Sequence, residues 1–348
     1  MSGSAAEGAP ETDLGDLVRR AAAGPLSAAD AEAAFTEVME GRATPVQMAA
    51  LLVAIRVRGA VPHEVAGGVR ALRRAMVPVA ADPAGLVDTC GTGGGAVQTF
   101  NISTAAALLA AGAGARVAKH GNRSFTSRCG SADVLEALGV RLELSPEEEA
   151  RVLERCGIVF MFAPLHHPAM KHIGPIRREL GMPTLMNVLG PVTNPAGARR
   201  QVVGVNDPAL LELIAGALAE LGHERALVVH GEPGLDELSP LGTSEVLEVA
   251  DGKWTRRTFD PAAELGWERY APDGLEGGDR DENARKVEGV LRGTLGGAAR
   301  AAVVLNAGAA LYAAGRSDTL VAGIRDAEAA LDAGQGWAKL EELRDATR

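Results

Sequence analysis

The chain has 348 residues, of which 47% are hydrophobic and only 3% are aromatic, and its net charge is -10 at pH 7. This length and composition are typical of a globular protein with a substantial core, and they exclude a disordered chain. The acidic balance also disfavours nonspecific nucleic-acid binding, because neutralising phosphates requires a basic surface.

No apolar run approaches the roughly eighteen residues of a membrane span. The polar N-terminus lacks the apolar segment of a signal peptide, and we expect residues 1–11 to form a disordered tail. Three cysteines, Cys90, Cys129 and Cys156, are too few and too dispersed for a disulfide framework or a tetrahedral zinc site. We therefore expect a cytoplasmic protein that contacts no membrane and whose cysteines are thiols.

The first eighty residues are typical of a run of short helices. Polar capping residues or prolines stand before apolar residues that recur every three to four positions. The expected start signals are, in chain order, Asp13, Ser27, Thr44 with Pro45, and Pro62. The sequence therefore predicts a small helical domain over residues 12–80.

From residue 86 onward, short apolar runs alternate with helical segments, which is typical of a parallel sheet covered by helices. The predicted strands are residues 85–90, 115–120, 140–144, 158–163, 201–205 and 225–231. The predicted helices between them are about 103–113, 131–138, 146–156, 168–180 and 208–221, and after residue 240 we expect a strand or two and three more helices. The fold class is thus α/β, with the helical domain followed by a larger α/β domain over residues 81–348 that has a mostly parallel central sheet.

A glycine-rich loop, "DTCGTGGGAVQTFNISTA", connects the first predicted strand of this sheet to a helix. "GTGGGA" formally satisfies the dinucleotide fingerprint, but "VQTFNI" separates the glycines from the helix, and no acid stands about twenty residues on. The lysine of a nucleotide P-loop is also missing. The sequence therefore argues against both kinds of nucleotide site.

Acidic residues are absent from the 44 residues between Thr89 and Ala132, where average composition would place about six. The same stretch carries Arg116, Lys119, Arg123 and Arg128. Glycines, a helix N-terminus and cationic side chains together favour a phosphate site. A merely flexible glycine turn is the alternative.

The segment "KHGNRS" follows the next predicted strand, so both loops should lie at the carboxyl edge of one sheet, where such sheets bind ligands. Lys119 would supply a positive charge, and Asn122 and Ser124 would supply hydrogen bonds. His120 alone would more often be structural than part of a site.

Together these motifs have a specific resemblance. "GTGG…NISTA…KHGNRS…GSADVLEALG", then "FAPLHHPAMK…IRRELG…NVLGPVTNP" and "GEPGLDELSP", in this order, resemble the anthranilate phosphoribosyltransferase family over roughly residues 12–345. The resemblance implies a nucleoside phosphorylase-like phosphoribosyltransferase fold, in which residues 170–195 add to the helical domain, and a homodimer formed through that domain. It also implies the activity: the phosphoribosyl group of 5-phosphoribosyl 1-pyrophosphate passes to the amine of anthranilate in tryptophan biosynthesis, with Mg²⁺ as cofactor and pyrophosphate released.

The resemblance further implies the site residues. Those that would bind the donor are Gly91, Gly94, Gly95, Thr99, Asn101, Ile102, Ser103, Thr104, Lys119, His120, Gly121, Asn122, Arg123, Ser124, Ser127 and Ser131. Those that would bind anthranilate are Gly91, Asn122, Arg177 and Pro191, with His120 also near the acceptor; the metal ligands would be Ser103, Asp236 and Glu237; and the catalytic residues would be Lys119, His120 and Arg177.

The chemistry of the residues agrees with these roles. Asp236 and Glu237 alone would be a solvated loop pair, but Mg²⁺ prefers one or two carboxylates together with phosphate oxygens. Arg177 and Arg178 alone would be exposed helix charges, but a guanidinium suits an acceptor that bears a carboxylate. Periodicity does not choose between the two arginines; the motif selects Arg177.

The sequence departs from the usual family pattern in two segments, and two alternative functions stay open. Gly95 stands where the family usually has aspartate, and Pro183 and Met186 stand where arginine and phenylalanine are common. A class II nucleoside phosphorylase would share the architecture but would need no clamp for a metal and pyrophosphate. A non-catalytic nucleic-acid-binding paralogue would need a basic surface, whereas the sequence pI is about 5.3.

Overall fold

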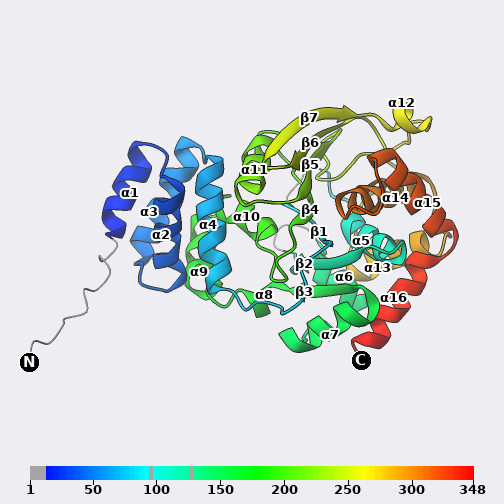
Figure 1. Cartoon of the computed structure of the whole chain (residues 1–348), viewed down its shortest axis with the longest axis horizontal. Coiled ribbons are helices and arrows are strands. Elements are labelled where there is room, and N and C mark those ends of the chain that lie inside the picture. The colour runs from blue at the N-terminus through cyan, green and yellow to red at the C-terminus, as the bar shows by residue number, and fades with distance from the viewer. Residues whose placement is uncertain (1–12, 94–96, 125–127) are drawn as a thin grey trace, which may run out of the picture.

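The structure is a computed structural model that describes residues 13–93, 97–124 and 128–348. The expected tail at residues 1–11 lies outside this range. Four N-terminal helices form a bundle at one end of the molecule (Figure 1). They are α1 (Leu14–Ala23), α2 (Ala28–Met39), α3 (Pro45–Arg58) and α4 (Pro62–Ala75).

The predicted helix caps of this bundle are confirmed. Asp13 and Ser27 each accept a hydrogen bond from the backbone N–H of the third residue of their helix. Thr44 forms a reciprocal capping box with Gln47 at the start of α3, where Pro45 takes the first helical position. Local sequence chemistry therefore sets where these helices begin.

The rest of the chain forms a seven-stranded sheet, in the order β3-β2-β1-β4-β5-β6-β7 within the described residues. The strands are β1 (Leu86–Gly91), β2 (Arg116–Gly121), β3 (Ile158–Phe162), β4 (Arg200–Gly204), β5 (Arg225–Gly231), β6 (Ser244–Ala250) and β7 (Lys253–Phe259). The first five are parallel, and β6 and β7 add an antiparallel edge. The prediction of a mostly parallel sheet beside a small helical domain is confirmed.

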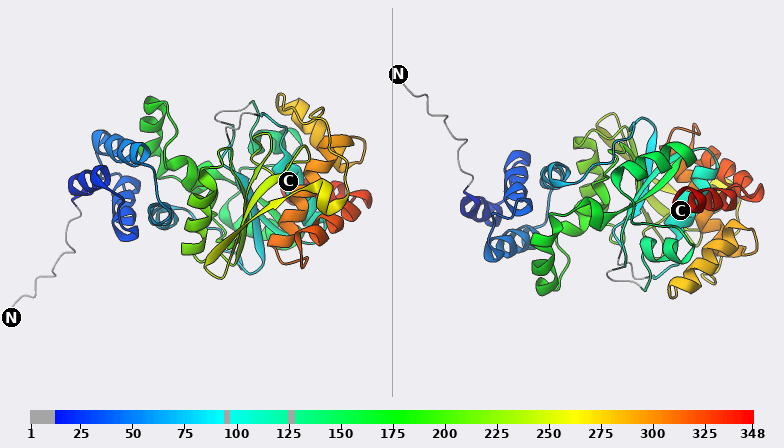
Figure 2. Two further views of the ribbon diagram at one scale, coloured as in Figure 1. Left: turned by 90° about the horizontal axis from the view of Figure 1, so that it is seen from above. Right: turned by 90° about the horizontal axis from the view of Figure 1, so that it is seen from below.

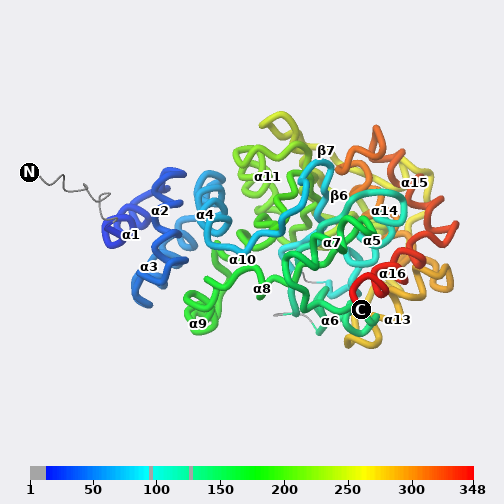
Figure 3. The backbone as a smooth tube through the Cα atoms, turned by 60° about the horizontal axis from the view of Figure 1, so that its bottom comes forward, coloured from blue at the N-terminus to red at the C-terminus, as the bar shows by residue number. Residues whose placement is uncertain are grey.

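Helices cover both faces of the sheet (Figure 2). The helices that follow α4 in the chain are α5 (Ile102–Gly112), α6 (Ser131–Ala137), α7 (Pro146–Cys156), α8 (Ala163–His166), α9 (Met170–Leu180), α10 (Met186–Leu189), a 3-10 turn at Gly190–Val192, α11 (Leu210–Glu220), α12 (Pro261–Leu265), α13 (Arg280–Leu291), α14 (Gly297–Ala313), α15 (Leu320–Asp332) and α16 (Gln335–Ala346). The C-terminal α16 returns to lie against α5 and α7 (Figure 3).

Alternate residues of the central strands enter two separate hydrophobic cores. Val202 and Leu227 point into a core formed with α5, α14 and their neighbours. Val203 and Val228 point into a core shared with α11 and the helical bundle. This two-residue alternation is what a pleated strand dictates, and it ties the bundle to one face of the sheet.

Two predictions about elements are wrong. Residues 140–144 form no strand, because β3 already occupies that edge of the sheet and the segment instead buries alternate residues on the core without a ladder partner. After residue 240 the chain forms five helices, α12 to α16, where three were expected. Within the described residues, no helix combines the length and apolar character needed to cross a membrane.

Candidate active site

Three neighbouring strands of the sheet, β1, β4 and β5, end in glycine. The loop that joins β5 to β6, residues 232–243, crosses all three strand ends. A Cβ on Gly91 would lie 2.6 Å from Asp236 Oδ2, a Cβ on Gly204 would overlap the Asp236 carbonyl, and one on Gly231 would overlap the Glu237 carbonyl. Only glycine lets the backbone approach this closely. Because these three residues have no side chain, the loop that carries the predicted acid pair can lie directly on the carboxyl ends of the parallel strands. Open α/β sheets bind ligands at this edge.

The two carboxylates of this loop are close enough for their charges to interact; Glu237 is buried and Asp236 is partly buried. Asp236 Oδ2 accepts a hydrogen bond of 3.2 Å from the backbone of Gly93, and burial raises the pKa of Asp236. Glu237 is 9% exposed, and its Oε2 has no hydrogen-bond partner among the described residues. Burial, and then the charge of Asp236, raise the pKa of Glu237 well above its ordinary value. A buried and a partly buried carboxylate, with one unsatisfied oxygen between them, fit a divalent cation.

Lys119 lies close enough to Glu237 for the charge of each to affect the pKa of the other. Its Nζ donates to the carbonyl of Thr89 and lies 3.3 Å from Thr89 Oγ1 and 3.4 Å from Ser103 Oγ. The side chain is 4% exposed, and burial lowers its pKa while the charge of Asp88 acts in the opposite direction. Lys119 and Ser103, which come from β2 and the start of α5, are therefore brought together.

Asp88 is a buried carboxylate that sequence analysis missed. It accepts hydrogen bonds from the His120 backbone (3.1 Å) and from Asn194 Nδ2 (2.9 Å). Burial raises its pKa to about 6. Its position in the apolar run "GLVDTC" was the available signal, since an acid is rarely fully buried unless it has partners.

His120 is paired with another histidine that sequence analysis did not single out. His120 Nε2 lies 3.2 Å from His167 Nε2. Burial, and then the neighbouring His167, depress the pKa of His120 well below its ordinary value, and burial lowers the pKa of His167 to about 4. Both imidazoles are therefore neutral near pH 7, and one donates its N–H to the other.

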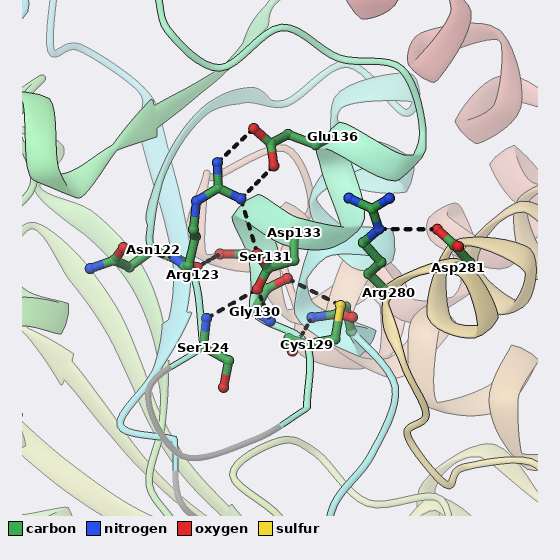
Figure 4. Close-up of polar contacts among 11 residues, drawn as sticks. Asn122, Arg123, Ser124, Cys129, Gly130, Ser131, Asp133, Glu136, Arg280 and Asp281 are labelled. Carbon is green, nitrogen blue, oxygen red and sulfur yellow. Dashed lines mark hydrogen bonds and ion pairs between the residues drawn. The ribbon is translucent and has the colours of Figure 1, made fainter.

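The segment after β2 is held by an acidic helix start (Figure 4). Arg123 pairs with Asp133 and Glu136 of α6, and Asp133 also accepts from the backbones of Ser124 and Gly130. Ser131 Oγ donates to the carbonyl of Asn122, and the Asn122 side chain points away from this cluster. The guanidinium of Arg123 is thus directed to the scaffold.

The start of α5 is fixed by Asn101, and the first turn of this helix holds no acid. Asn101 Nδ2 donates to the carbonyl of Cys129 (3.2 Å), and its Oδ1 accepts from Asn283 (3.0 Å). Asn283 is 2% exposed and was not predicted from the sequence. Thr99 forms an isolated antiparallel β-bridge with Glu276. The predicted donor residues Ile102 and Thr104 are buried.

The predicted acceptor residues divide between two places. The Pro191 carbonyl accepts from Gln201 Nε2 (2.6 Å) and from the Cys90 thiol (3.2 Å), so Pro191 lies against the end of β1. Arg177 lies on α9, which packs against α2 and α3, and its guanidinium is 3.5 Å from Asn187 Oδ1. Burial lowers the pKa of Arg177. The predicted donor residues Gly94, Gly95 and Ser127 lie outside the described residues.

The fold and site have the features of a two-domain transferase: a helical bundle joined to a sheet with a glycine loop and an acid pair. The helical-bundle domain of the glycosyl transferase family matches residues 16–76, and the a/b domain of that family matches residues 83–337. The chain is therefore a glycosyltransferase of this class.

Proteins of one kind recur among its relatives. The anthranilate phosphoribosyltransferase of Rubrobacter xylanophilus is 53% identical over 95% of this chain and 96% of its own length, and that of Roseiflexus sp. is 50% identical over 93% and 94%. The crystal structure of the enzyme from Thermus thermophilus matches with a TM-score of 0.89 at 44% identity, covering 96% of this chain and 99% of that one.

A more distant solved structure is the Saccharomyces cerevisiae enzyme in complex with PRPP and Mg, which matches with a TM-score of 0.85 at 25% identity over 96% and 97% of the two chains. The chain belongs to the anthranilate phosphoribosyltransferase family.

Proposed function

We propose that this enzyme transfers the phosphoribosyl group of 5-phosphoribosyl 1-pyrophosphate to the amine of anthranilate. The products are N-(5-phosphoribosyl)anthranilate and pyrophosphate, in a step of tryptophan biosynthesis. The observation that carries the proposal is the acid pair that lies against the glycine ends of β1, β4 and β5 and near the charge of Lys119. The relatives named anthranilate phosphoribosyltransferase, which are similar along nearly the whole chain, also support the proposal.

Mg²⁺ is the cofactor, and the unsatisfied oxygen of Glu237 is the feature that fits it. Asp236, Glu237 and Ser103 would hold the ion, which neutralises negative charge on the leaving group. The solved yeast complex with PRPP and Mg supports this assignment.

The donor binds along the strand ends and the start of α5. Backbone N–H groups near Gly91 and at the N-terminus of α5 face the phosphates, and no acid in the first turn of that helix opposes them. Lys119 adds positive charge next to Ser103. As the bond from C1 of the ribose to pyrophosphate breaks, these groups stabilise the negative charge that develops on the departing oxygen.

The acceptor binds next to the donor, at Asn122, Arg177, Pro191 and Gly91. The carboxylate of anthranilate pairs with the guanidinium of Arg177, and the amine nitrogen forms the new bond to C1. That nitrogen then loses a proton. His120, held neutral by burial and by His167, has an imidazole able to accept it.

The proposal extends to the architecture of the enzyme. We assign residues 12–80 with about 170–195 to the helical domain, and residues 81–348 to the α/β domain; the packing of α9 against α2 and α3 supports this division. We assign a homodimer formed through the helical domain and a location in the cytoplasm, with no nucleic-acid or membrane partner.

An assay with purified protein tests the activity. With 5-phosphoribosyl 1-pyrophosphate, Mg²⁺ and anthranilate, the fluorescence of anthranilate should fall, and chelating the metal with EDTA should stop the loss. Persistent fluorescence, with phosphorolysis of a nucleoside by inorganic phosphate instead, would show that the enzyme is a nucleoside phosphorylase.

A further inference from the structure

A buried asparagine lies within α14, a helix whose residues are mostly buried in the core. Asn306 lies in the middle of α14, between Leu305 and Ala307, and is 4% exposed. Asparagine is a poor helix former and is costly to bury without hydrogen bonds. A residue that violates both rules at one position needs a specific partner to explain it.

That partner is the residue next to the acid pair. Asn306 Oδ1 accepts from the backbone N–H of Leu238 (2.9 Å), and its Nδ2 donates to the carbonyl of the same residue (3.1 Å). Nδ2 also donates to the carbonyl of Ala302, one turn earlier in α14 (2.9 Å). One amide side chain thus satisfies both peptide groups of Leu238, directly after Glu237.

The loop is therefore clamped from two sides. Gly91, Gly204 and Gly231 let it press onto the strand ends, and α14 holds its next residue from within the core. Burial first, and then the charge of Asp236, raise the pKa of Glu237, so holding the two carboxylates together before a cation arrives is unfavourable and the loop backbone needs support. A neutral amide provides that support without competing with the cation for a carboxylate.

We propose that Asn306 is a positioning residue that preorganises Asp236 and Glu237 for the divalent cation. This inference rests on the proposed function, because it takes the acid pair to be the metal site. Removing a group that orients metal ligands commonly weakens metal affinity by about 10 to 100-fold. The loss should appear in metal binding and not in anthranilate binding.

The test measures Mn²⁺ binding by electron paramagnetic resonance, with the full chain and saturating pyrophosphate and without turnover. Asn306→Ala should raise the dissociation constant of Mn²⁺ by about tenfold or more, while the KM for anthranilate in the full reaction changes by less than about twofold. Val303→Ala is the matched control: it creates a packing defect in the same helix, where Val303 is fully buried, and should leave Mn²⁺ binding unchanged.

Equal Mn²⁺ affinity in wild type and Asn306→Ala would overturn the proposal, as would equal weakening by Val303→Ala. If Asn306→Ala does not fold, Asn306→Asp keeps the volume and the acceptor for Leu238 N–H but loses the donor, and it should weaken Mn²⁺ binding in the same direction. If neither variant folds, hydrogen exchange on the metal-free wild type decides: slow exchange of the Leu238 amide supports a preformed clamp, and fast exchange overturns it. Because the Mn²⁺-binding and hydrogen-exchange readouts need no turnover, a wild type that binds Mn²⁺ but makes no phosphoribosylanthranilate would contradict the proposed function alone.

Discussion

At the scale of single residues, Lys119 is a buried positive charge within the proposed active site. Its ammonium is held by Thr89 and Ser103, and the carboxylate of Asp88 lies close enough to affect its pKa. Lys119→Met keeps most of the side-chain length and removes the charge. Losing one preorganised electrostatic contact commonly costs about 10² to 10³-fold in turnover, and steady-state kinetics of the transferase reaction should show a fall of that size in kcat.

The matched control for this variant lies on the same strand. Arg116 begins β2 and pairs with Glu154 at the surface. Arg116→Met removes the same charge from the protein and should leave kcat within about twofold, since the partners of Arg116, which are Glu154 and the carbonyls of Asp82 and Ala84, lie outside the proposed site. Full activity of Lys119→Met would show that the buried charge has no part in the reaction.

His223 gives the protein a measurable pH dependence far from the proposed active site. It is 3% exposed, and burial lowers its pKa to about 4 from an ordinary value of 6.5. The unfolded chain therefore binds a proton at a higher pH than the folded chain does, so stability falls as the pH drops from 6.5 toward 4.

His223→Asn removes this titration and keeps a donor for the Leu218 carbonyl, which His223 Nδ1 contacts at 3.2 Å. Between pH 7.5 and pH 5, the free energy of unfolding of the wild type should fall by about 2 kcal/mol more than that of the variant. Urea unfolding at the two pH values measures the difference. Parallel losses in both proteins would mean that His223 titrates normally in the fold.

At the scale of elements, the ends of the central strands decide where the acid pair lies. Gly204 closes β4, and any Cβ there would overlap the carbonyl of Asp236. Gly204→Ala must displace the loop, because backbone cannot move aside as a flexible side chain can. We expect it to raise the Mg²⁺ concentration needed for half-maximal activity by about tenfold, as measured in the fluorescence assay.

A second glycine serves as the control for this change. Gly296 precedes α14 with φ of -100°, a value that alanine adopts, and an added Cβ would meet no atom within 4 Å. Gly296→Ala should keep the wild-type Mg²⁺ requirement. An unchanged requirement in Gly204→Ala would show that the loop is not seated by the strand end.

What the sequence could predict among these elements follows from the range of the interactions. Helix caps such as Ser27 and Thr44 act within four residues, so their patterns predict them correctly. The segment 140–144 alternates like a strand, but whether it joins a ladder depends on β3 already holding the edge. No local pattern carries that information.

The same limit applies to the site. The glycine loop and the stretch without acidic residues indicate a phosphate site by themselves. Asp236 and Glu237 were predicted to bind the metal only through the family resemblance. Asp88, Asn283 and Asn306 were missed because their partners lie 32 to 182 residues away in the chain. A polar residue inside an apolar strand or helix was the signal that could have found Asp88 and Asn306.

At the scale of the whole molecule, the helical bundle leaves one face of α3 uncovered. Val46 and Val57 are 78% and 79% exposed, and about three helical turns separate them, so they lie on the same side of the helix. The opposite side packs into the core through Leu51 and Ile55. This exposed stripe, at the end of the molecule away from the C-terminal helices (Figure 1), is where the proposed homodimer would form.

The double variant V46D/V57D should therefore dissociate the dimer, because burying two carboxylates across an apolar contact is unfavourable. Sedimentation should give about twice the chain mass of 35.8 kDa for the wild type and the single mass for the variant. Trp254→Ser, which removes an exposed apolar residue of β7, is the control and should stay dimeric. A monomeric wild type would contradict the proposed dimer. A dimeric double variant would show that the interface does not include this face of α3. Neither result bears on the active-site residues, which the kinetic and metal-binding experiments test.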